Sequence, residues 1–306
     1  MEKCIFAYNP HSGKGKVAKH EKEIIEKLGT KYDVELVLSQ YPGHIYDVIL
    51  EKGESVDLFV VAGGDGTLNE AVNGICHLNK KPKLGLIPAG TVNDVAHSLK
   101  IPRTIKGAVK NILNGSTFAH DAIKVNDRYG IYVCCAGLFT ETSYATTQES
   151  KKRIGKLAYG FHALKKLFST PAFNIKLTYD GQELNKKCSL IMILNSKNVA
   201  GLPINRRAKL NDGLIDVVLI RNKRKNVGGI GFWGVVKLFL FGIKEKSNKN
   251  YTHLLLDEFN IETEADTVIN LDGEKICKGN FHLKMIKEGV DIVVPDNFIK
   301  KNENKK

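Results

Sequence analysis

Cysteine patterns typical of metal sites and disulfide frameworks are missing from this sequence of 306 residues. It has six cysteines, none in a Cys-x-x-Cys pair, and most lie in or beside apolar runs. Zinc modules and small secreted domains depend on paired cysteines, so the spacing argues against both. We expect reduced, mostly buried thiols in a cytoplasmic protein.

A hydrophobic run long enough to cross a membrane is also missing. The longest nearly apolar stretch extends from Gly228 to Ile243 and contains Lys237, whereas a spanning helix needs about 20 apolar residues. The N-terminal apolar run ends early, at Asn9-Pro10, which does not fit a signal peptide. We expect a protein that at most lies on a membrane surface.

Negative charge falls well short of positive charge in one part of the chain only. The 46 Lys and Arg exceed the 33 Asp and Glu, giving a net charge of +13. Residues 1–122 hold 15 basic and 14 acidic side chains (net +1), and residues 123–306 hold 31 and 19 (net +12). The basic part indicates an anionic partner, such as nucleic acid, a membrane surface or a phosphorylated ligand, or else a solvated lysine-rich surface.

What the first 122 residues do contain is a regular alternation of strand-like and helix-like segments. The predicted strands are Cys4–Tyr8, Val34–Leu38, Asp57–Val61 and Leu84–Ile87. The predicted helices are Gly15–Leu28, Ile45–Lys52, Thr67–His77, Asn93–Leu99 and Ile105–Asn114. This alternation predicts a doubly wound α/β domain over residues 1–122, with a mostly parallel sheet covered on both faces.

From Ile123 onward the pattern changes to strands at hairpin spacing. They are Ile123–Val125, Gly130–Cys135, Phe173–Tyr179, Cys188–Leu194, Leu214–Ile220, Glu258–Glu262, Thr267–Leu271, Phe281–Ile286 and Val290–Val294. Two amphipathic or apolar helices, Lys151–Phe168 and Gly231–Ile243, interrupt them. We predict an antiparallel β-sandwich domain over residues 123–299, followed by a frayed polar tail at 300–306.

The first polar turn, Asn9-Pro-His-Ser-Gly-Lys-Gly15, stands between a predicted strand and a predicted helix. Unpaired N–H groups and the positive end of a helix at such a turn suit a phosphate. Gly13-x-Gly15-x-x-Ala18 matches a dinucleotide fingerprint, with Asp33 and Glu35 as the acidic partners. A purely structural turn is an equal alternative.

The second turn, Gly63-Gly64-Asp65-Gly66-Thr67, follows a buried strand and is more specific. Its glycines let a ligand approach the backbone, at the strand end where α/β sheets bind ligands. Thr67 and Glu70 fit a capping box, a structural alternative for those two. Asp65 has no such role and is interpreted as a catalytic or metal-binding carboxylate.

The third turn, Gly90-Thr91-x-Asn93-Asp94, repeats this arrangement after the next strand. Asn93 or Asp94 as a helix N-cap is the structural alternative. Two neighbouring strands that each deliver an acid to one sheet edge favour phosphoryl transfer, which needs Mg²⁺ and positioned charge.

Together these turns resemble the diacylglycerol kinase catalytic-domain family, which includes bacterial lipid kinases and sphingosine kinases. The resemblance continues through Tyr41-Pro-Gly-His44, Gly155-Lys-Leu-Ala-Tyr159, Asn211-Asp-Gly-x-x-Asp216 and Leu271-Asp-Gly-Glu274, and so covers nearly the whole chain. NAD kinases share the Gly-Gly-Asp-Gly turn but not the later motifs.

The resemblance implies a two-domain kinase with ATP in the cleft between the domains. Its implied nucleotide contacts are Asn9, Pro10, Ser12, Gly13, Ser39, Gly64, Asp65, Gly66, Thr67, Asn69, Glu70 and Thr91. Glu274 would be the general base, with Asp65 and Asp94 completing the Mg²⁺ network. Asp272 is the alternative base, and a plain turn is the alternative for this whole segment.

The resemblance also implies a structural Mg²⁺ bound by the Asp212 carboxylate and backbone oxygens of Lys209 and Leu214. An oxygen shell of this kind suits a hard cation. The alternative is that Asn211-Asp212-Gly213 is only a hairpin turn.

The function expected from these observations is an ATP-dependent lipid kinase that converts diacylglycerol to phosphatidic acid during transient association with an anionic membrane surface. One alternative is a kinase of a soluble substrate such as NAD. Another is a non-catalytic regulator that binds nucleotides or nucleic acid. The basic residues lack the interleaved aromatics of a stacking platform, so no nucleic-acid partner is expected. The sequence leaves a homodimer open.

Overall fold

The computed structural model describes residues 1–11, 15–137, 172–199, 201–221, 238, 242–243, 247 and 251–303. The predicted helix Lys151–Phe168, the Gly155–Tyr159 motif, Ser12, Gly13 and most of Gly231–Ile243 lie outside these residues. In the described part, no helix is both long and apolar enough to cross a membrane.

The first part of the chain alternates strands and helices, as predicted. Its elements are β1 (Glu2–Tyr8), α1 (Lys16–Lys19), α2 (Glu21–Leu28), β2 (Tyr32–Leu38), α3 (His44–Lys52), the 3₁₀ turn η2 (Gly53–Ser55), β3 (Leu58–Gly63), α4 (Asp65–His77), β4 (Lys83–Pro88), α5 (Asp94–Ser98) and α6 (Ile105–Asn114). The strands pair in parallel in the order β4-β3-β1-β2.

Alternate side chains of β1 enter two different cores. Ile5 and Ala7 pack in the cluster that includes residues of α3 and α4, while Phe6 and Tyr8 pack with residues of α2 and α6. Because successive strand residues point to opposite faces, this division shows a sheet covered by helices on both sides. The predicted doubly wound α/β architecture is confirmed.

The rest of the chain is mainly antiparallel strand. It contains β5 (Ser116–Val125), β6 (Arg128–Gly130), β7 (Val133–Gly137), β8 (Phe173–Tyr179), β9 (Gln182–Leu194), β10 (Ile215–Arg221), β11 (Tyr251–Leu256), β12 (Glu258–Thr263), β13 (Val268–Leu271), β14 (Glu274–Lys278), β15 (Phe281–Val294) and the helix α11 (Asp296–Glu303). A separate apolar cluster fills this part, with alternate residues of β9 and β10 directed into it. The predicted sandwich is confirmed.

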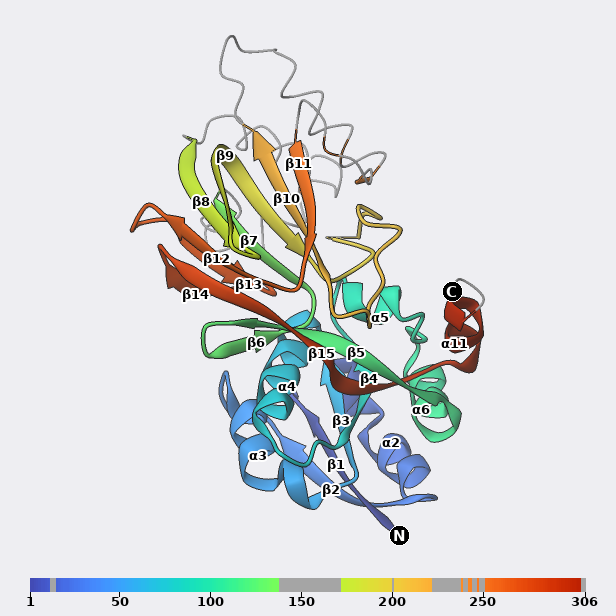
Figure 1. The fold of residues 1–306 in the computed structure, drawn as a ribbon. Coiled ribbons are helices and arrows are strands. Elements are labelled where there is room, and N and C mark those ends of the chain that lie inside the picture. Colours follow the sequence, from blue (N-terminus) through green and yellow to red (C-terminus); the bar gives the residue numbers. More distant parts are fainter. Residues whose placement is uncertain are drawn as a thin grey trace, which may run out of the picture.

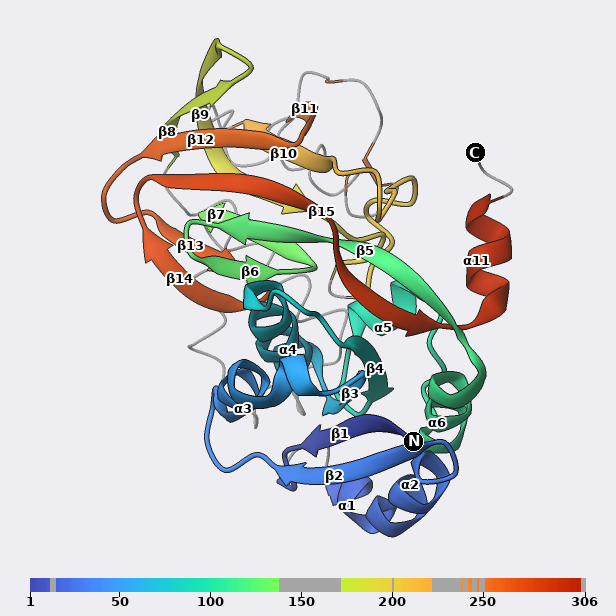
Figure 2. The ribbon, with the colours of Figure 1, turned by 60° about the horizontal axis from the view of Figure 1, so that its bottom comes forward.

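β5 and β15 connect the two parts of the molecule. They pair antiparallel from Leu283↔Val125 to Val294↔Ser116, with a bulge between Ile286 and Val290. β15 also pairs in parallel with β4 and antiparallel with β12, so the parallel sheet and the sandwich belong to one 15-stranded network. Figures 1 and 2 both show the two strands side by side, running from the sandwich toward α6 and α11.

Several element boundaries differ from the sequence predictions. The predicted helix 15–28 is broken at His20 into α1 and α2. The predicted strands 281–286 and 290–294 are the two halves of β15, and β5 begins at Ser116 rather than Ile123. The polar tail is not frayed throughout, because α11 extends to Glu303 and the buried Phe298 anchors it.

Candidate active site

The predicted phosphate-binding turns meet at the carboxyl edge of the parallel sheet. β1 and β3 are neighbours, but the chain leaves them toward opposite sides, β1 to β2 and β3 to β4. This is a topological switch point, where open α/β sheets bind ligands. The Asn9 and Gly63–Thr67 turns flank it, and Ser39 is attached beside them by its backbone N–H to the carbonyl of Tyr8 (2.9 Å).

The glycines of the second and third turns are needed because the two turns touch. A Cβ on Gly90 would lie 2.5 Å from the Cα of Gly64. The Asn93 amide then fixes the third turn, since Nδ2 donates to the Gly90 carbonyl (2.8 Å) and Oδ1 accepts from the Gly90 N–H (3.1 Å). Gly66 differs from these glycines, because nothing lies within 4 Å of its would-be Cβ.

Asp65 joins the two turns through its carboxylate. It is the first residue of α4, and its Oδ2 accepts a hydrogen bond from the backbone N–H of Asn93 at the start of α5 (3.0 Å). Burial raises the pKa of Asp65, and the nearby carboxylates of Asp94 and Asp272 raise it further, against the N–H donors of Asn93 and Asp94. The structure thus brings Asp65 and Asp94 together, and their shared role at a Mg²⁺ ion stays a prediction.

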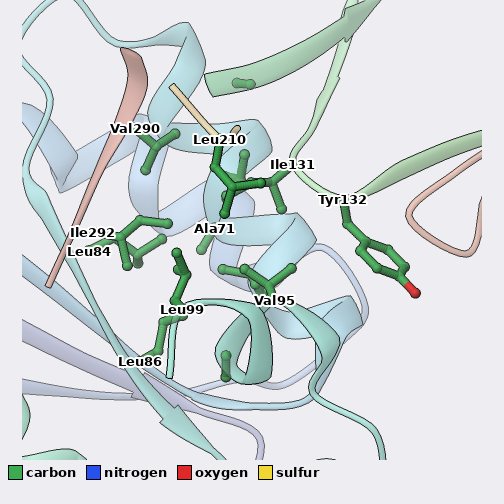
Figure 3. Packing of buried hydrophobic residues seen from close by; sticks show 14 of the residues in the cluster. Ala71, Leu84, Leu86, Val95, Leu99, Ile131, Tyr132, Leu210, Val290 and Ile292 are labelled. Atoms are coloured by element: carbon green, nitrogen blue, oxygen red, sulfur yellow. The ribbon is translucent and has the colours of Figure 1, made fainter. Parts of the chain in front are cut away.

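Asp94 connects α5 to the second part of the chain. It is buried, its Oδ1 accepts from the backbone N–H of Gly201 (2.9 Å), and its Oδ2 accepts from the Tyr132 hydroxyl (2.5 Å). Figure 3 shows Tyr132 at the margin of the apolar cluster, with its hydroxyl directed away from the other labelled side chains. Both neighbours come from segments distant in sequence.

Asp272 is the most heavily hydrogen-bonded carboxylate among the described residues of this region. One oxygen accepts from the Asn69 amide (2.9 Å) and the Ile131 N–H (2.8 Å), and the other from the N–H groups of Tyr132 (2.9 Å) and Val133 (2.8 Å). Burial raises its pKa and the four donors oppose this rise. With both oxygens engaged, Asp272 positions the backbone between β6 and β7 and is poorly placed to accept a proton.

Glu274 lies two residues away in a different environment. Leu271 and Glu274 pair across a two-residue turn in which Asp272 (φ 52°) and Gly273 (φ 100°) are both left-handed, as a type I′ hairpin requires. The Glu274 side chain is 48% exposed, and Arg128 is its one described ion-pair partner, at 3.8 Å. The segment is thus a hairpin turn, which holds Glu274 accessible and Asp272 buried, and the base role of Glu274 stays a prediction.

Glu70 does not form the capping box that was the structural alternative for it. α4 begins at Asp65 with Gly64 as its N-cap, so Thr67 lies inside the first turn, and no side chain caps the helix. The Glu70 carboxylate instead lies near the start of α3, where the backbone N–H groups of Gly43 and Ile45 act to lower its pKa, and its Oε2 is buried with no hydrogen-bond partner among the described residues. Burial raises its pKa, and the charge of nearby Glu274 contributes to that rise. Glu274 therefore lies near Glu70 of α4.

The remaining residues predicted to contact the nucleotide differ in their exposure and in their hydrogen bonds. Asn9 accepts the backbone N–H of His11 on its side chain (2.9 Å), Ser39 is nearly buried with its hydroxyl on the Tyr41 carbonyl (3.3 Å), and Thr91 is exposed. Asn69 is buried against Asp272. Among the dinucleotide-fingerprint acids, Glu35 is ion-paired with Lys52.

The predicted structural metal loop lies apart from these turns, in the connection between β9 and β10. It is not a hairpin turn, because the whole irregular segment from Asn195 to Leu214 separates the two strands. Asp212 accepts the Leu214 N–H (3.1 Å), and neighbouring Asp121 accepts the Gly213 N–H (2.7 Å). Nothing in these contacts places Lys209 as a ligand, so this magnesium site stays a prediction.

Comparison with known proteins agrees with this arrangement. Residues 3–125 match the family model of the diacylglycerol kinase catalytic domain, and residues 135–229 match the YegS C-terminal NAD kinase beta sandwich-like domain. A diacylglycerol kinase of Staphylococcus aureus strain MRSA252 is 30% identical over 304 residues, covering 97% of this chain and 94% of the relative. The chain belongs to the diacylglycerol kinase family. The resemblance found in the motifs is confirmed.

Solved structures of the diacylglycerol kinase family share the fold. A Bacillus anthracis crystal structure, described provisionally as a diacylglycerol kinase, has a TM-score of 0.83 at 26% identity and covers 97% of this chain and 96% of its own. Another from that organism has a TM-score of 0.78 at 25% identity, with 96% and 98% covered. Membership in this kinase family implies a phosphotransferase that uses ATP.

Two residues that support the site were missed in the sequence. Tyr132 and Gly201 both bind Asp94, but neither belongs to a motif with a recognisable spacing. Their roles depend on contacts across 38 and 107 residues of chain. Local sequence carries no signal for such contacts.

Proposed function

We propose that this protein transfers the terminal phosphoryl group of ATP to the hydroxyl of a membrane lipid, most simply diacylglycerol, giving phosphatidic acid and ADP. The observation that carries the proposal is the pair of carboxylates in the β13–β14 turn. Asp272 is saturated by four donors and Glu274 is accessible. Phosphoryl transfer works by positioning and electrostatics, with one carboxylate near the attacking hydroxyl. Glu274 is that base in this proposal, and Asp272 is not.

The nucleotide side of the proposal uses the start of α4. Backbone N–H groups at the beginning of a helix, and the positive end of its dipole, favour phosphate oxygens. Gly66 leaves open space at this helix start. A phosphate chain can therefore approach the Gly64–Thr67 backbone, with Asn9, Ser39 and Thr91 arranged around the same edge.

Mg²⁺ fits the Asp65–Asp94 pair. These are oxygen donors from two adjacent turns, and mutual repulsion together with burial raises the pKa of Asp65. A divalent cation relieves such repulsion. Mg²⁺ usually takes one or two carboxylates plus phosphates and waters, so this pair supplies the protein ligands that the proposal requires. When bound, the ion would neutralise charge on the phosphates.

The lipid side rests on three supports. The S. aureus relatives are named diacylglycerol kinases. Residues 123–306 carry a net charge of +12, which suits an anionic bilayer surface. Three exposed apolar side chains lie where β2 and β4 end, near the proposed nucleotide site: Leu38 is the last residue of β2, Tyr41 follows β2, and Val92 follows β4. We propose that the enzyme is cytoplasmic and attaches transiently to the membrane surface.

The test is a Glu274→Gln variant assayed with Mg-ATP and diacylglycerol in anionic mixed micelles. Losing the base should lower turnover by about 100-fold or more, with the melting temperature unchanged because Glu274 is exposed. Glu262→Gln, an exposed carboxylate on β12 that contacts Lys176, is the matched control and should retain activity. Turnover within a few-fold of wild type in Glu274→Gln would contradict the assignment.

The same assay separates the second candidate substrate. NAD is favoured by one observation, the match of residues 135–229 to an NAD kinase beta sandwich-like domain. If the protein phosphorylates NAD and no lipid alcohol, the lipid part of the proposal is wrong and the phosphotransferase part holds.

A further inference from the structure

A pocket lined by basic residues lies away from the turns of the candidate active site. Its volume is about 510 Å³, and it is an open pocket lined by the end of α5, the segment after it, the β9–β10 connection and α11. Six basic side chains line it: His97, Lys100, Arg103, Lys197, Arg206 and Lys301. No carboxylate appears among the described residues that line it.

The floor of this basic pocket is fixed by buried polar contacts. The hydroxyls of Ser98 and Ser196 lie 3.1 Å apart, and the Asn198 amide donates to Ser98 (3.1 Å). On the α11 side, buried Phe298 packs edge-on against Phe118, and the Lys197 ammonium lies 5.7 Å from the Phe298 ring centre. Segments distant in sequence are thus held together around the cations.

Lys100 carries a charge at a position where the backbone conformation favours glycine. It follows α5 with a left-handed backbone (φ 57°) and donates its N–H to the His97 carbonyl (3.1 Å). Glycine is the usual residue at such a helix end, since an L-residue there costs about 1 kcal/mol. A lysine in this position keeps a cation at the pocket wall.

Helix dipoles explain only part of the cluster. Lys301 lies in the last turn of α11, where a cation is favourable. Lys197 and Arg206 lie in the β9–β10 connection, away from helix ends, and Arg103 precedes Thr104, the N-cap of α6, where the helix dipole disfavours a cation. Like charges gathered in a hollow repel one another and attract an anion with complementary charge.

We propose that this basic pocket binds a phosphate group, either from the headgroup of an anionic lipid or from a free phosphate. Guanidinium groups such as Arg103 and Arg206 pair with phosphate oxygens in a bidentate manner, and the lysines add point charge. The pocket includes His97 and Ser98 at one end of α5, and Asp94 stands at the other. The site is thus distinct from the active site but shares a helix with it. It does not depend on the proposed function.

The test combines a charge-removing variant with a charge-matched control. The variant is Arg103→Gln, Arg206→Gln and Lys301→Gln together, all exposed side chains. The control is Lys22→Gln, Lys27→Gln and Lys187→Gln, which are also exposed but lie on α2 and β9. Lys100→Gly is a further single variant that removes a charge while relaxing the backbone, so that loss of binding cannot be ascribed to misfolding.

Binding is measured with saturating ADP present, so that the nucleotide edge is occupied. One probe is inorganic phosphate titrated at constant ionic strength, and the other is vesicles of phosphatidylcholine with or without phosphatidylglycerol. The triple variant should lose about tenfold or more in apparent affinity, and the control less than twofold. Loss with vesicles alone identifies a lipid headgroup, and loss with phosphate identifies a soluble source. Equal binding by variant and control with both probes overturns the proposal.

Discussion

At the scale of single residues, the β13–β14 turn gives Asp272 and Glu274 different environments, although the two acids lie only two residues apart in the sequence. Asp272 and Glu274 both belong to Leu271-Asp-Gly-Glu274, and each was a candidate base. The structure separates them by environment, because backbone donors surround Asp272 and solvent reaches Glu274. An acid already accepting four hydrogen bonds stabilises local structure, whereas an accessible one can exchange a proton.

This difference predicts opposite behaviour of two amide substitutions. Asp272→Asn replaces one oxygen by an NH₂ group that would face two N–H donors, so it should lower the free energy of unfolding by about 3 kcal/mol. Glu274→Gln should leave that free energy unchanged. Urea unfolding of both variants checks this. Equal stability of Asp272→Asn and wild type would mean that the network around Ile131–Val133 is not important for folding.

At the scale of elements, the sequence predicted best where a strand and its turn form a local unit. The strands and the order of the α/β part follow from alternating apolar patterns, and the three polar turns were correctly placed at strand ends. The prediction failed at helix beginnings and long strands. α4 begins two residues before the predicted Thr67, since Asp65 and Gly66 already adopt helical backbone. β15 appeared as two strands because the bulge near Val290 interrupts its pattern.

Among the candidate site residues too, local motifs could be recognised in the sequence, whereas contacts between distant segments could not. The carboxylates Asp65, Asp94 and Glu274 were identified from motifs of a few residues. The partners of Asp94 were not, because Tyr132 and Gly201 reach it only after the sandwich packs on the first part of the chain. Glu70, for which a capping box in its own helix was the structural alternative, lies instead near the start of α3, a contact between elements that no local pattern encodes.

The start of α4 allows a prediction that separates binding from stability. Gly66→Ala meets no neighbour within 4 Å, and alanine in a helix is up to about 1 kcal/mol more favourable than glycine. The variant should be at least as stable as wild type. It should nevertheless bind ATP several-fold more weakly, because the added methyl group occupies the space proposed for phosphate.

Gly90→Ala is the matched comparison for Gly66→Ala. Its Cβ would lie 2.5 Å from the Gly64 backbone, so the two turns must move apart at a cost of about 1–3 kcal/mol. Thermal unfolding and titration with a fluorescent ATP analogue measure both properties. Unchanged ATP affinity in Gly66→Ala would show that phosphate does not approach this helix start.

At the scale of the whole molecule, the charge boundary and the packing boundary do not coincide. The net charge is +1 for residues 1–122 and +12 for residues 123–306, but this division cuts through β5, which extends from Ser116 to Val125. β15 returns from the sandwich to place Val290, Ile292 and Val294 in the core that also contains residues of α3 and α4. The last residues of the chain therefore complete the first part of the fold.

This return predicts that the two parts unfold together. If residues 281–303 were removed, the first part of the fold would lose the core strand β15 and the buried Phe298 of α11. Burial of three β-branched side chains of β15 contributes about 5 kcal/mol or more to the free energy of unfolding. Scanning calorimetry of the full chain should show one transition whose calorimetric and van't Hoff enthalpies agree. A chain ending at residue 280 should lose the helical signal of α2–α6 as well as the sandwich. Two separate transitions in the full chain, or native helix content in the shortened one, would mean that the α/β part is stable without β15.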